Sequence, residues 1–468
     1  MKYLLGDDYN ELERQEIYFS PLENLNDPME GFLDLFWDGD DVVWKNFFRN
    51  YLRTLYWTVE SALLGVEGES LKKNIVSTCR KVEFYTINAA TLAVIEQKFI
   101  ETKNIKELCK HLLTSARTSD EVIYYCELIH FEALSIIYKQ LYKSGAVDYD
   151  AYNSFIKVLR PIQKSSYLNL LTFLQKKDEE HKGFERIACE IARKYRSQQM
   201  LIQECNAEQG KGTVQILLFG FPRTYVENLN LLVYPRGLVA CFSKDVSNAS
   251  LWGYYADSHS GAALKFKTKR DEDRISLLLR NRVGCSGRAG QDVVHHYDMV
   301  SNQFYEVIYK KKYPEVDFFR SLGALPAPEI ESWLWDESGN CSACREAMKD
   351  IDSWRRRYWN TFYEIGTTKL EDWKHEDEYR LLLNETGFSY EKLDDRKLQY
   401  NFSDLEGIVF GIKTSNEDKL KAIEVINGKC QKEKRNDFKF YQAYYDRKTG
   451  LIGHDELTLL NRHIASLV

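Results

Sequence analysis

Trp252-Gly-Tyr-Tyr-Ala-Asp-Ser-His-Ser-Gly261 packs aromatic, acidic, imidazole and glycine groups into one short stretch. Leu238-Val-Ala-Cys-Phe242 precedes it, and Ala262-Ala-Leu-Lys-Phe266 follows it directly. Both apolar runs predict strands, and the residues between them predict a helix that begins near Ala249. The order strand, helix and strand therefore favours a core in which helices and strands are mixed.

The predicted helix has a face with two alternative uses. Trp252, Tyr255 and His259 lie at i, i+3 and i+7, which places their side chains on one side of the helix. Such a face can stack on a ring and form hydrogen bonds with it. The alternative is an amphipathic helix that packs its aromatic residues on a core. The stretch alone favours packing, and the polar groups that interrupt the aromatic stripe shift this balance somewhat toward binding.

The rest of the chain divides into a β-containing part and a helical part. Ile17-Tyr-Phe-Ser20 predicts a strand that ends at Pro21, whereas apolar residues recur at helical spacing from Asp41 to Cys205. Pro161 predicts a kink or break in that block, and residues 206–213 have the composition of a linker. Further strands are predicted at 214–219, 231–234, 379–383 and 407–412, an exposed excursion at 270–292, and helices at 301–311 and 342–363.

The predicted fold class is α+β, with a split mixed or antiparallel β core interrupted by a large all-helical insertion. The predicted boundaries are residues 1–40 for the first part of the core, 41–205 for the insertion and 214–468 for the remainder. At 468 residues, the chain is long enough for two or three domains.

Composition predicts a cytoplasmic protein. No apolar run approaches the roughly 20 residues that span a bilayer, and the first residues lack the features of a signal peptide. The ten cysteines show no regular framework, so we expect free thiols. A formal charge of −6 disfavours a protein that coats nucleic acid, although a local basic groove remains an alternative.

Two polar stretches carry most of the predicted chemistry. Asn26-Asp-Pro-Met-Glu30 follows the first strand and favours either a turn or a binding loop. Trp373-Lys-His-Glu-Asp-Glu-Tyr-Arg-Leu381 places Glu376, Glu378 and Arg380 on one face if it is extended. Two carboxylates and a guanidinium can hold a sugar hydroxyl, orient a phosphate and stabilise a developing cation. The alternative is a ladder of exposed charges, which the apolar continuation after Arg380 disfavours.

Several common chemistries lack their motifs. The sequence has no phosphate-binding loop ending in Lys-Ser or Lys-Thr, no GxGxxG after a strand and no GxSxG elbow. His295-His296 and His375 have no metal-ligand spacing, and Cys341-Ser-Ala-Cys344 is an isolated pair, so no metal is predicted. Cys241 is a conceivable nucleophile beside His259, but a cysteine within an apolar strand is more often part of the core.

Four segments in the same order resemble the bacterial family called domain of unknown function 2971. The resemblance covers roughly residues 1–36 and 214–450, with the helical block as an insertion, and it suggests an effector of bacterial defence or of a mobile element. The segments are Ile17-Tyr-Phe-Ser-Pro21 with Asn26-Asp-Pro-Met-Glu30, Cys241-Phe-Ser243 with Trp252, Tyr255-Ala-Asp257, His259 and Gly261, Trp373 with Glu376 and Glu378-Tyr-Arg380, and Ile408-Val-Phe-Gly411.

A weaker analogy links the same segments to ADP-ribosyltransferases, whose split β core binds NAD. It implies a polar residue near the first strand (Ser20 or Asn26), an aromatic residue (Tyr255) and a glutamate on a late strand (Glu378). The chain departs from that pattern, because it has no Ser-Thr-Ser strand and no histidine or arginine on the first strand.

The leading hypothesis is an enzyme that transfers ADP-ribose from NAD or hydrolyses NAD, with NAD as substrate. The predicted catalytic residues are Glu378, Tyr255 and His259, and Arg380 and His259 are expected to hold phosphate. The predicted ligand-binding residues are Tyr18, Ser20, Asn26, Asp27, Trp252, Asp257, Glu376 and Arg380.

Two alternatives belong to other classes. In the first, the chain is a non-catalytic sensor whose core binds a nucleotide-like molecule and whose helical block binds a partner protein. In the second, Asp27, Glu30, Glu376 and Glu378 hold a divalent metal in a nuclease. Nucleic acid therefore stays an alternative partner, whereas no membrane is expected.

Overall fold

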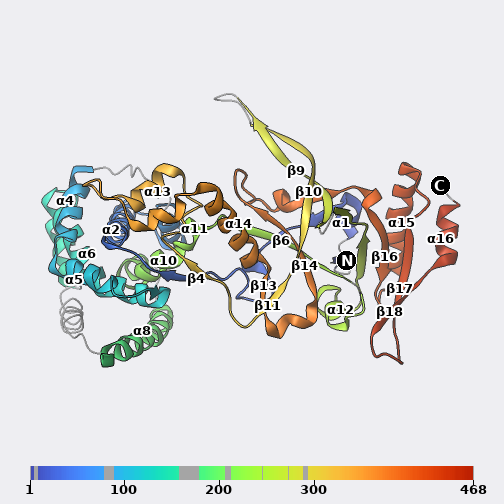
Figure 1. Cartoon of the computed structure of the whole chain (residues 1–468), viewed down its shortest axis with the longest axis horizontal. Coiled ribbons are helices and arrows are strands. Elements are labelled where there is room, and N and C mark those ends of the chain that lie inside the picture. Colours follow the sequence, from blue (N-terminus) through green and yellow to red (C-terminus); the bar gives the residue numbers. More distant parts are fainter. Residues whose placement is uncertain are drawn as a thin grey trace. The chain divides into compact units, whose positions relative to one another are not determined.

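The computed structural model describes residues 2–4, 9–78, 89–157, 179–205, 212–244, 246–271, 274–287 and 293–466. Helices and mixed, mainly antiparallel sheets both occur (Figure 1), which confirms the α+β fold class. Pro161 and most of the predicted linker lie outside the described residues. Among the described helices, none has both the length and the apolar character needed to cross a membrane.

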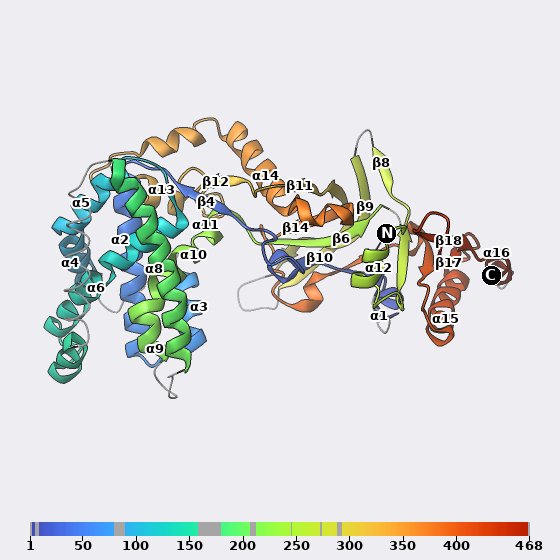
Figure 2. The same ribbon diagram turned by 90° about the horizontal axis from the view of Figure 1, so that it is seen from below.

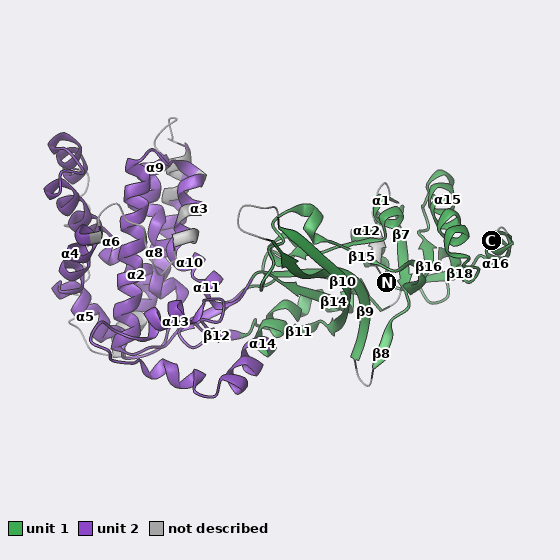
Figure 3. Cartoon of the chain, turned by 90° about the horizontal axis from the view of Figure 1, so that it is seen from above, with its two compact units in different colours: residues 1–32, 236–314, 360–468 green, residues 33–235, 315–359 purple. Residues whose placement is uncertain are grey.

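The chain divides into two compact units (Figure 3). The first, here called the core unit, contains residues 1–32, 236–314 and 360–468. The second, here called the helical unit, contains residues 33–235 and 315–359. The helical unit is therefore built from two chain segments, and it is larger than the block predicted at 41–205.

The helical unit consists mainly of helices (Figure 2). These helices bury aromatic and aliphatic side chains. Helix α2 packs against α3, α4, α5 and α6. The helical elements are α2 (Asp41–Leu63), α3 (Gly68–Thr78), α4 (Ala89–Ile100), α5 (Lys103–Leu112), α6 (Ser119–Lys143), α8 (Glu179–Cys205), α9 (Gly212–Gln215), a π-helical turn (Ile216–Gly220), α10 (Phe221–Asn228), α11 (Asn230–Val233), α13 (Ala327–Leu334) and a 3₁₀ turn (Ala343–Met348). Among its described residues, this unit also has the short strands β4 (Asp34–Trp37), β5 (Arg117–Thr118) and β12 (Glu315–Asp317).

The strands predicted at 214–219 and 231–234 were wrong, because both segments are helical. Ile216, Leu217 and Leu218 are all buried. A short run of consecutive apolar residues has no period that separates a strand from a helix. The packing of the helical unit decides the conformation here.

The core unit contains an eight-stranded and a five-stranded sheet. Their orders are β2-β15-β9-β10-β14-β6-β3, with β8 beside β9, and β1-β7-β16-β17-β18. The strands are β1 (Lys2–Leu4), β2 (Glu16–Tyr18), β3 (Ser20–Pro21), β6 (Gly237–Ser243), β7 (Ala262–Phe266), β8 (Lys269–Asp271), β9 (Arg274–Ser286), β10 (Val294–Glu306), β14 (Glu378–Asn384), β15 (Lys397–Tyr400), β16 (Leu405–Phe410), β17 (Lys439–Tyr445) and β18 (Ile452–Glu456).

A small parallel pair and several helices complete this unit. The pair is β11 (Ile308–Lys310) with β13 (Thr368–Leu370). The helices are α1 (Tyr9–Arg14), α12 (Ala249–Tyr255), α15 (Asn416–Glu433) and α16 (Thr458–Ala465), with 3₁₀ turns at Leu22–Asn24, Glu371–Glu376, Leu393–Arg396 and Phe402–Asp404. Helix α14 (Ile351–Thr367) begins in the helical unit and ends in the core unit.

The faces of β14 separate the hydrophobic core from the polar site. Leu381 and Leu383 join a core shared by both large sheets, and Tyr379 packs against that core. Side chains alternate along a strand, so Glu378 and Arg380 project from the opposite face. That face meets the end of α14, because a Cβ built on Gly366 would lie 2.3 Å from Leu382.

The helix predicted at 301–311 was wrong, since these residues belong to β10 and β11. The excursion predicted at 270–292 is instead largely strand in its described part, where β9 pairs with β10 in a long hairpin (Figure 1). Pairing between β9 and β10 extends from Ser276 with Gln303 to Ser286 with Val294. This long ladder overrides the weak helical spacing of the aromatic residues in β10.

Candidate functional site

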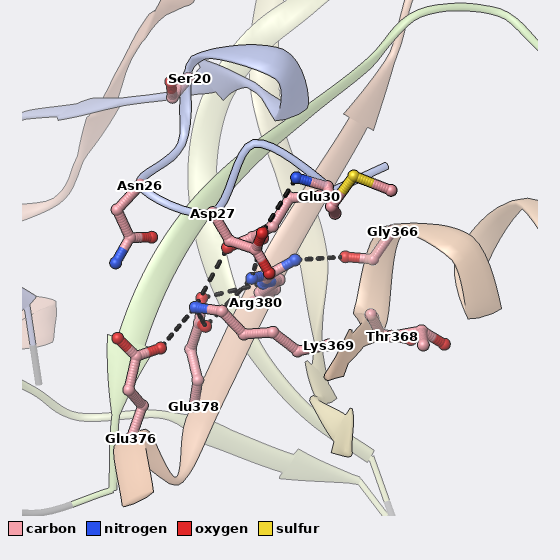
Figure 4. Close-up of polar contacts among 12 residues, drawn as sticks. Ser20, Asn26, Asp27, Glu30, Gly366, Thr368, Lys369, Glu376, Glu378 and Arg380 are labelled. Atoms are coloured by element: carbon pink, nitrogen blue, oxygen red, sulfur yellow. Dashed lines mark hydrogen bonds and ion pairs between the residues drawn. The ribbon is translucent and has the colours of Figure 1, made fainter. Parts of the chain in front are cut away.

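Five charged side chains converge on the polar face of β14 (Figure 4). We call them the charged cluster, and its members are Glu30, Lys369, Glu376, Glu378 and Arg380. All five residues are buried, and the most exposed of them, Glu378, has 7% of its surface accessible. Charged side chains are rarely buried unless they are paired.

Arg380 holds two carboxylates of the cluster together. Its Nε donates to Glu378 Oε1 over 2.8 Å, and one Nη donates to Glu378 Oε2 over 3.0 Å and also to Glu30. Its other Nη donates to the carbonyl oxygen of Gly366 over 2.9 Å. The whole guanidinium is therefore engaged within the protein.

Lys369 places its ammonium among three carboxylates. Its Nζ lies 3.0 Å from Glu30 Oε1 and 3.4 Å from Glu378 Oε2. It forms a third ion pair with Glu376 Oε2. The Nζ also lies 4.8 Å from the ring centroid of Trp373, within the range of a cation–π contact. The cluster thus combines residues from the 26–31 loop, β13, the following 3₁₀ turn and β14.

A change of backbone conformation between Glu376 and Glu378 brings both carboxylates to Lys369. Residues Glu371–Glu376 form a 3₁₀ turn, so the extended conformation predicted from Glu376 onward begins only at Glu378. Between them, Asp377 adopts a left-handed conformation with φ of 45°. This reversal brings Glu376 and Glu378 to the same ammonium, although they do not share one strand face.

The cluster holds three carboxyl groups and two cations, so its net charge is negative when all three carboxyl groups are ionised. Burial opposes ionisation of Glu378, but Arg380 and Lys369 outweigh it and lower the pKa of Glu378 to about 2. For Glu30, burial dominates and raises the pKa above its ordinary value. The ionised Glu378 therefore persists at neutral pH.

We expect acid to weaken the fold through Glu378. Because its pKa is lowered from 4.5 to about 2, its stabilisation is complete above pH 4.5 and is lost as the pH falls through 2. The shift corresponds to about 3 kcal/mol. Urea unfolding between pH 4.5 and 2 should therefore show a steeper loss of stability for the native chain than for Glu378→Gln. Equal slopes for the two proteins would contradict the pKa assigned to Glu378.

Asn26 and Tyr255 connect the cluster to the protein surface. Asn26 is exposed, and its Nδ2 donates to the Tyr255 hydroxyl over 3.0 Å. That hydroxyl donates to Glu376 Oε1, also over 3.0 Å. Burial and the neighbouring carboxylates raise the pKa of Tyr255, so the hydroxyl stays protonated. The structure thus brings Asn26, Tyr255, Glu376 and Glu378 into one connected group.

Asp27 and two further tyrosines surround this group. Asp27 is buried and accepts hydrogen bonds from the Met29 amide over 2.9 Å and from the Tyr313 hydroxyl over 3.5 Å. The Glu378 amide donates to the hydroxyl oxygen of Tyr309 over 3.1 Å. Burial raises the pKa values of Tyr309 and Tyr313 to about 12. These neutral phenols enclose the cluster without adding charge.

Trp252 does not face a ligand, which corrects the prediction of a ring-stacking role. It is fully buried in a second core with Val246, Ala263 and Val409. Its indole N–H donates to the Val246 carbonyl oxygen over 2.8 Å. For this residue, packing of an amphipathic helix was the correct alternative.

His259 does not share a helix face with Tyr255, because α12 ends at Tyr255. Asp257, Ser258 and His259 have φ values of 44°, 53° and 74°, which form a left-handed turn. The His259 ring stacks on Trp252 with 6.5 Å between ring centroids. Burial and Lys413 lower the pKa of His259, so a charged imidazole that holds phosphate is not supported.

The turn explains why a glycine occurs at position 411. The amide of Gly411 donates to the Gly261 carbonyl oxygen over 3.0 Å, and the Lys413 amide donates to the His259 carbonyl oxygen over the same distance. A Cβ built on Gly411 would lie 2.2 Å from that His259 oxygen. Glycine is therefore required for close backbone contact here.

The remaining predicted site residues lie outside the connected group or are occupied within it. Tyr18 accepts a hydrogen bond from Arg396 over 3.4 Å, and Ser20 lies apart from the cluster in Figure 4. Ser20 Oγ donates locally to the Pro21 carbonyl oxygen. Asp257 is exposed in the left-handed turn. Arg380 is fully buried with every nitrogen engaged, so the phosphate-holding role expected for it was wrong.

The cysteines and histidines considered for other chemistry show no reactive arrangement. Burial raises the pKa of Cys241 well above its ordinary value, which disfavours a thiolate nucleophile. Cys341 and Cys344 are free thiols. In the described ranges, no group of three or more histidine, cysteine or acidic residues is arranged to hold a metal.

Lys369 occupies the position that a cation would take between the three glutamates. We therefore expect Lys369→Ala to create a calcium-responsive protein, because oxygen ligands then face an empty position. Millimolar calcium should raise the melting temperature of this variant and leave the native chain unchanged in a thermal unfolding assay. Magnesium and sodium chloride at equal ionic strength are the controls. If Lys369→Ala folds but its melting temperature does not change with calcium, the Lys369 ammonium does not occupy the position of a cation.

Sequence reasoning missed Lys369 and the two tyrosines and gave Glu30 a role only in the nuclease alternative. Lys369 lies in a three-residue strand with no motif, and its neighbours gave no signal of burial. Tyr309 lies within the segment 301–311 that was predicted as a helix, and Tyr313 follows that segment. One signal in the sequence could have identified Glu30 as a site residue. It lies close to Asp27, in a loop that the sequence had already marked as polar.

Comparisons of the chain with protein-family models, with curated proteins and with solved structures found no match. The proposed function therefore rests on the residues of the site and their geometry.

Proposed function

We propose that the core unit acts on NAD, either transferring its ADP-ribosyl group to an acceptor or hydrolysing it. The observation that carries the proposal is the uncompensated negative charge of the charged cluster. NAD contains a positively charged nicotinamide ring, and cleavage of its bond to ribose develops positive charge on the sugar. A fixed carboxylate stabilises such charge most strongly where water is excluded.

Glu378 is the cluster member best suited to approach a ligand. Its side chain retains 8% exposure, whereas the side chains of the other four members have 1% or less. Its low pKa keeps it ionised. We assign it the role of stabilising the ribosyl cation as the bond to nicotinamide breaks and the bonding electrons leave with the ring.

Tyr255 and Asn26 form the proposed entrance to the site. The Tyr255 ring is partly exposed, and its hydroxyl is fixed between Asn26 and Glu376. A ring whose hydroxyl is held by two hydrogen bonds offers an oriented surface for stacking by nicotinamide. Glu376 and Lys369 then act as positioning residues. Glu376 accepts a hydrogen bond from the Tyr255 hydroxyl, and Lys369 pairs with Glu378.

The proposed setting is a bacterial cytoplasm, where the chain acts as an effector of defence or of a mobile element. The described cysteines are free thiols, as expected in a reducing compartment. The resemblance of four segments to domain of unknown function 2971 supports the effector role. The helical unit is the proposed surface for a partner protein.

Release of nicotinamide tests the enzyme proposal. The full chain is incubated with NAD, and free nicotinamide is quantified by liquid chromatography while candidate protein and nucleic acid acceptors are examined by mass spectrometry. We expect free nicotinamide, with or without a covalent mark on an acceptor. If NAD binds with no nicotinamide released, the chain is a ligand sensor, and the catalytic proposal fails.

A further inference from the structure

A pocket lies on the face of β14 opposite to the charged cluster. Its volume is about 230 Å³, and it is formed in part by Phe242 on β6, Phe266 on β7, Phe304 on β10 and Tyr379 on β14. Phe242 pairs directly with Tyr379 across β6 and β14. Because side chains alternate, Tyr379 and Glu378 face opposite sides of the sheet.

The rings of this pocket are arranged around a buried floor. Phe242 is 5% exposed, and Phe266, Phe304 and Tyr379 are partly buried around it. The Phe242 ring is perpendicular to Phe304 at 4.9 Å between centroids and close to perpendicular to Phe266 at 5.9 Å. A planar ring that enters the pocket therefore meets both ring edges and ring faces, which are the contacts aromatic groups prefer.

Two lysines give the pocket a positive rim. Lys244 and Lys265 both line it, together with Thr268. Lys265 is paired with Glu406 over 2.8 Å, whereas Lys244 is exposed and forms no ion pair within the part of the chain that the structure describes. The charge available to a ligand thus comes mainly from Lys244.

We infer that this pocket binds the base of a nucleoside monophosphate, with the phosphate at Lys244. The volume is below the 300–1,000 Å³ typical of sites that enclose a whole drug-sized ligand. It is sufficient for a base but leaves the sugar and phosphate at the rim. This site is separate from the proposed NAD site, because it lies on the opposite face of β14 and uses none of the charged cluster.

Calorimetric titration of the full chain with AMP tests the inference, with adenosine and inorganic phosphate as partial ligands. We expect AMP to bind more tightly than either partial ligand. Lys244→Gln should weaken AMP binding about threefold, as for an exposed ion pair, and leave adenosine unchanged. Phe266→Ala should weaken both by about tenfold, the equivalent of one stacked base.

Two control variants distinguish this pocket from the NAD site. Lys269→Gln removes an exposed charge from the neighbouring β8, outside the pocket lining, and should leave AMP binding unchanged. Tyr255→Phe removes the hydroxyl that donates to Glu376 of the charged cluster and should also leave AMP binding unchanged. AMP binding that is insensitive to Lys244→Gln, or that is lost in Tyr255→Phe, overturns the inference. Either result leaves the proposal for NAD to be judged by nicotinamide release.

Discussion

Replacing Arg380 with methionine is expected to destabilise the core unit by about 3–5 kcal/mol, the usual cost of removing one partner from a buried ion pair. The substitution leaves Glu30 and Glu378 buried without their guanidinium and frees the Gly366 carbonyl oxygen. Hydrogen exchange of peptides from β6 and β14 measures the effect within the core unit. Protection of these strands should fall by several orders of magnitude.

Arg236→Met is the matched control for that prediction. Arg236 also pairs with a glutamate, Glu23, but the two side chains are 30% and 55% exposed. Exposed pairs contribute about 0–1 kcal/mol, so exchange in this variant should stay close to that of the native chain. Similar effects of Arg380→Met and Arg236→Met would show that the charged cluster is not a buried network.

The second large effect is expected from Glu378→Gln on NAD cleavage. If the native chain releases nicotinamide, this variant should do so about 10²–10³ times more slowly, the range for loss of one group that stabilises transition-state charge. The expected loss falls on kcat, because the charge develops mainly as the bond breaks. Steady-state nicotinamide release gives kcat and KM separately.

Two further variants show whether the loss of turnover is specific to Glu378→Gln. Glu406→Gln alters a glutamate paired with Lys265 on another sheet and should retain full turnover. Tyr255→Phe keeps the ring but removes the hydroxyl that joins Asn26 to Glu376, so KM should change more than kcat. Full turnover by a folded Glu378→Gln protein removes Glu378 from the mechanism.

Local pattern was sufficient for much of the core unit. The apolar runs at 238–242 and 262–266 are strands β6 and β7, and helix α12 begins at Ala249 as expected. The run at 214–219 has the same apolar character, yet it is helical, and its buried residues pack against α2, α6 and α10 of the helical unit. The three runs differ in conformation because of tertiary packing, about which the local sequence pattern carries no information.

The site was predictable where its residues lie in polar segments beside strands. Asn26, Tyr255, Glu376 and Glu378 come from three distant segments; hydrogen bonds link the first three, and Lys369 links Glu376 to Glu378. Lys369 joins them through tertiary structure alone. His259 was misplaced because helical spacing was extended past Tyr255, where the backbone turns left-handed. A periodicity argument holds only as far as the helix continues.

The preference of the chain for NAD over NADH tests the central claim most directly. The two molecules share every group except the nicotinamide ring, which is positively charged in NAD and neutral in NADH. If the excess negative charge of the charged cluster recognises this ring, calorimetry should show NAD binding about tenfold more tightly, a difference of about 1.4 kcal/mol. The preference should shrink in Glu378→Gln. Equal affinities for NAD and NADH, or tighter binding of NADH, would contradict the account.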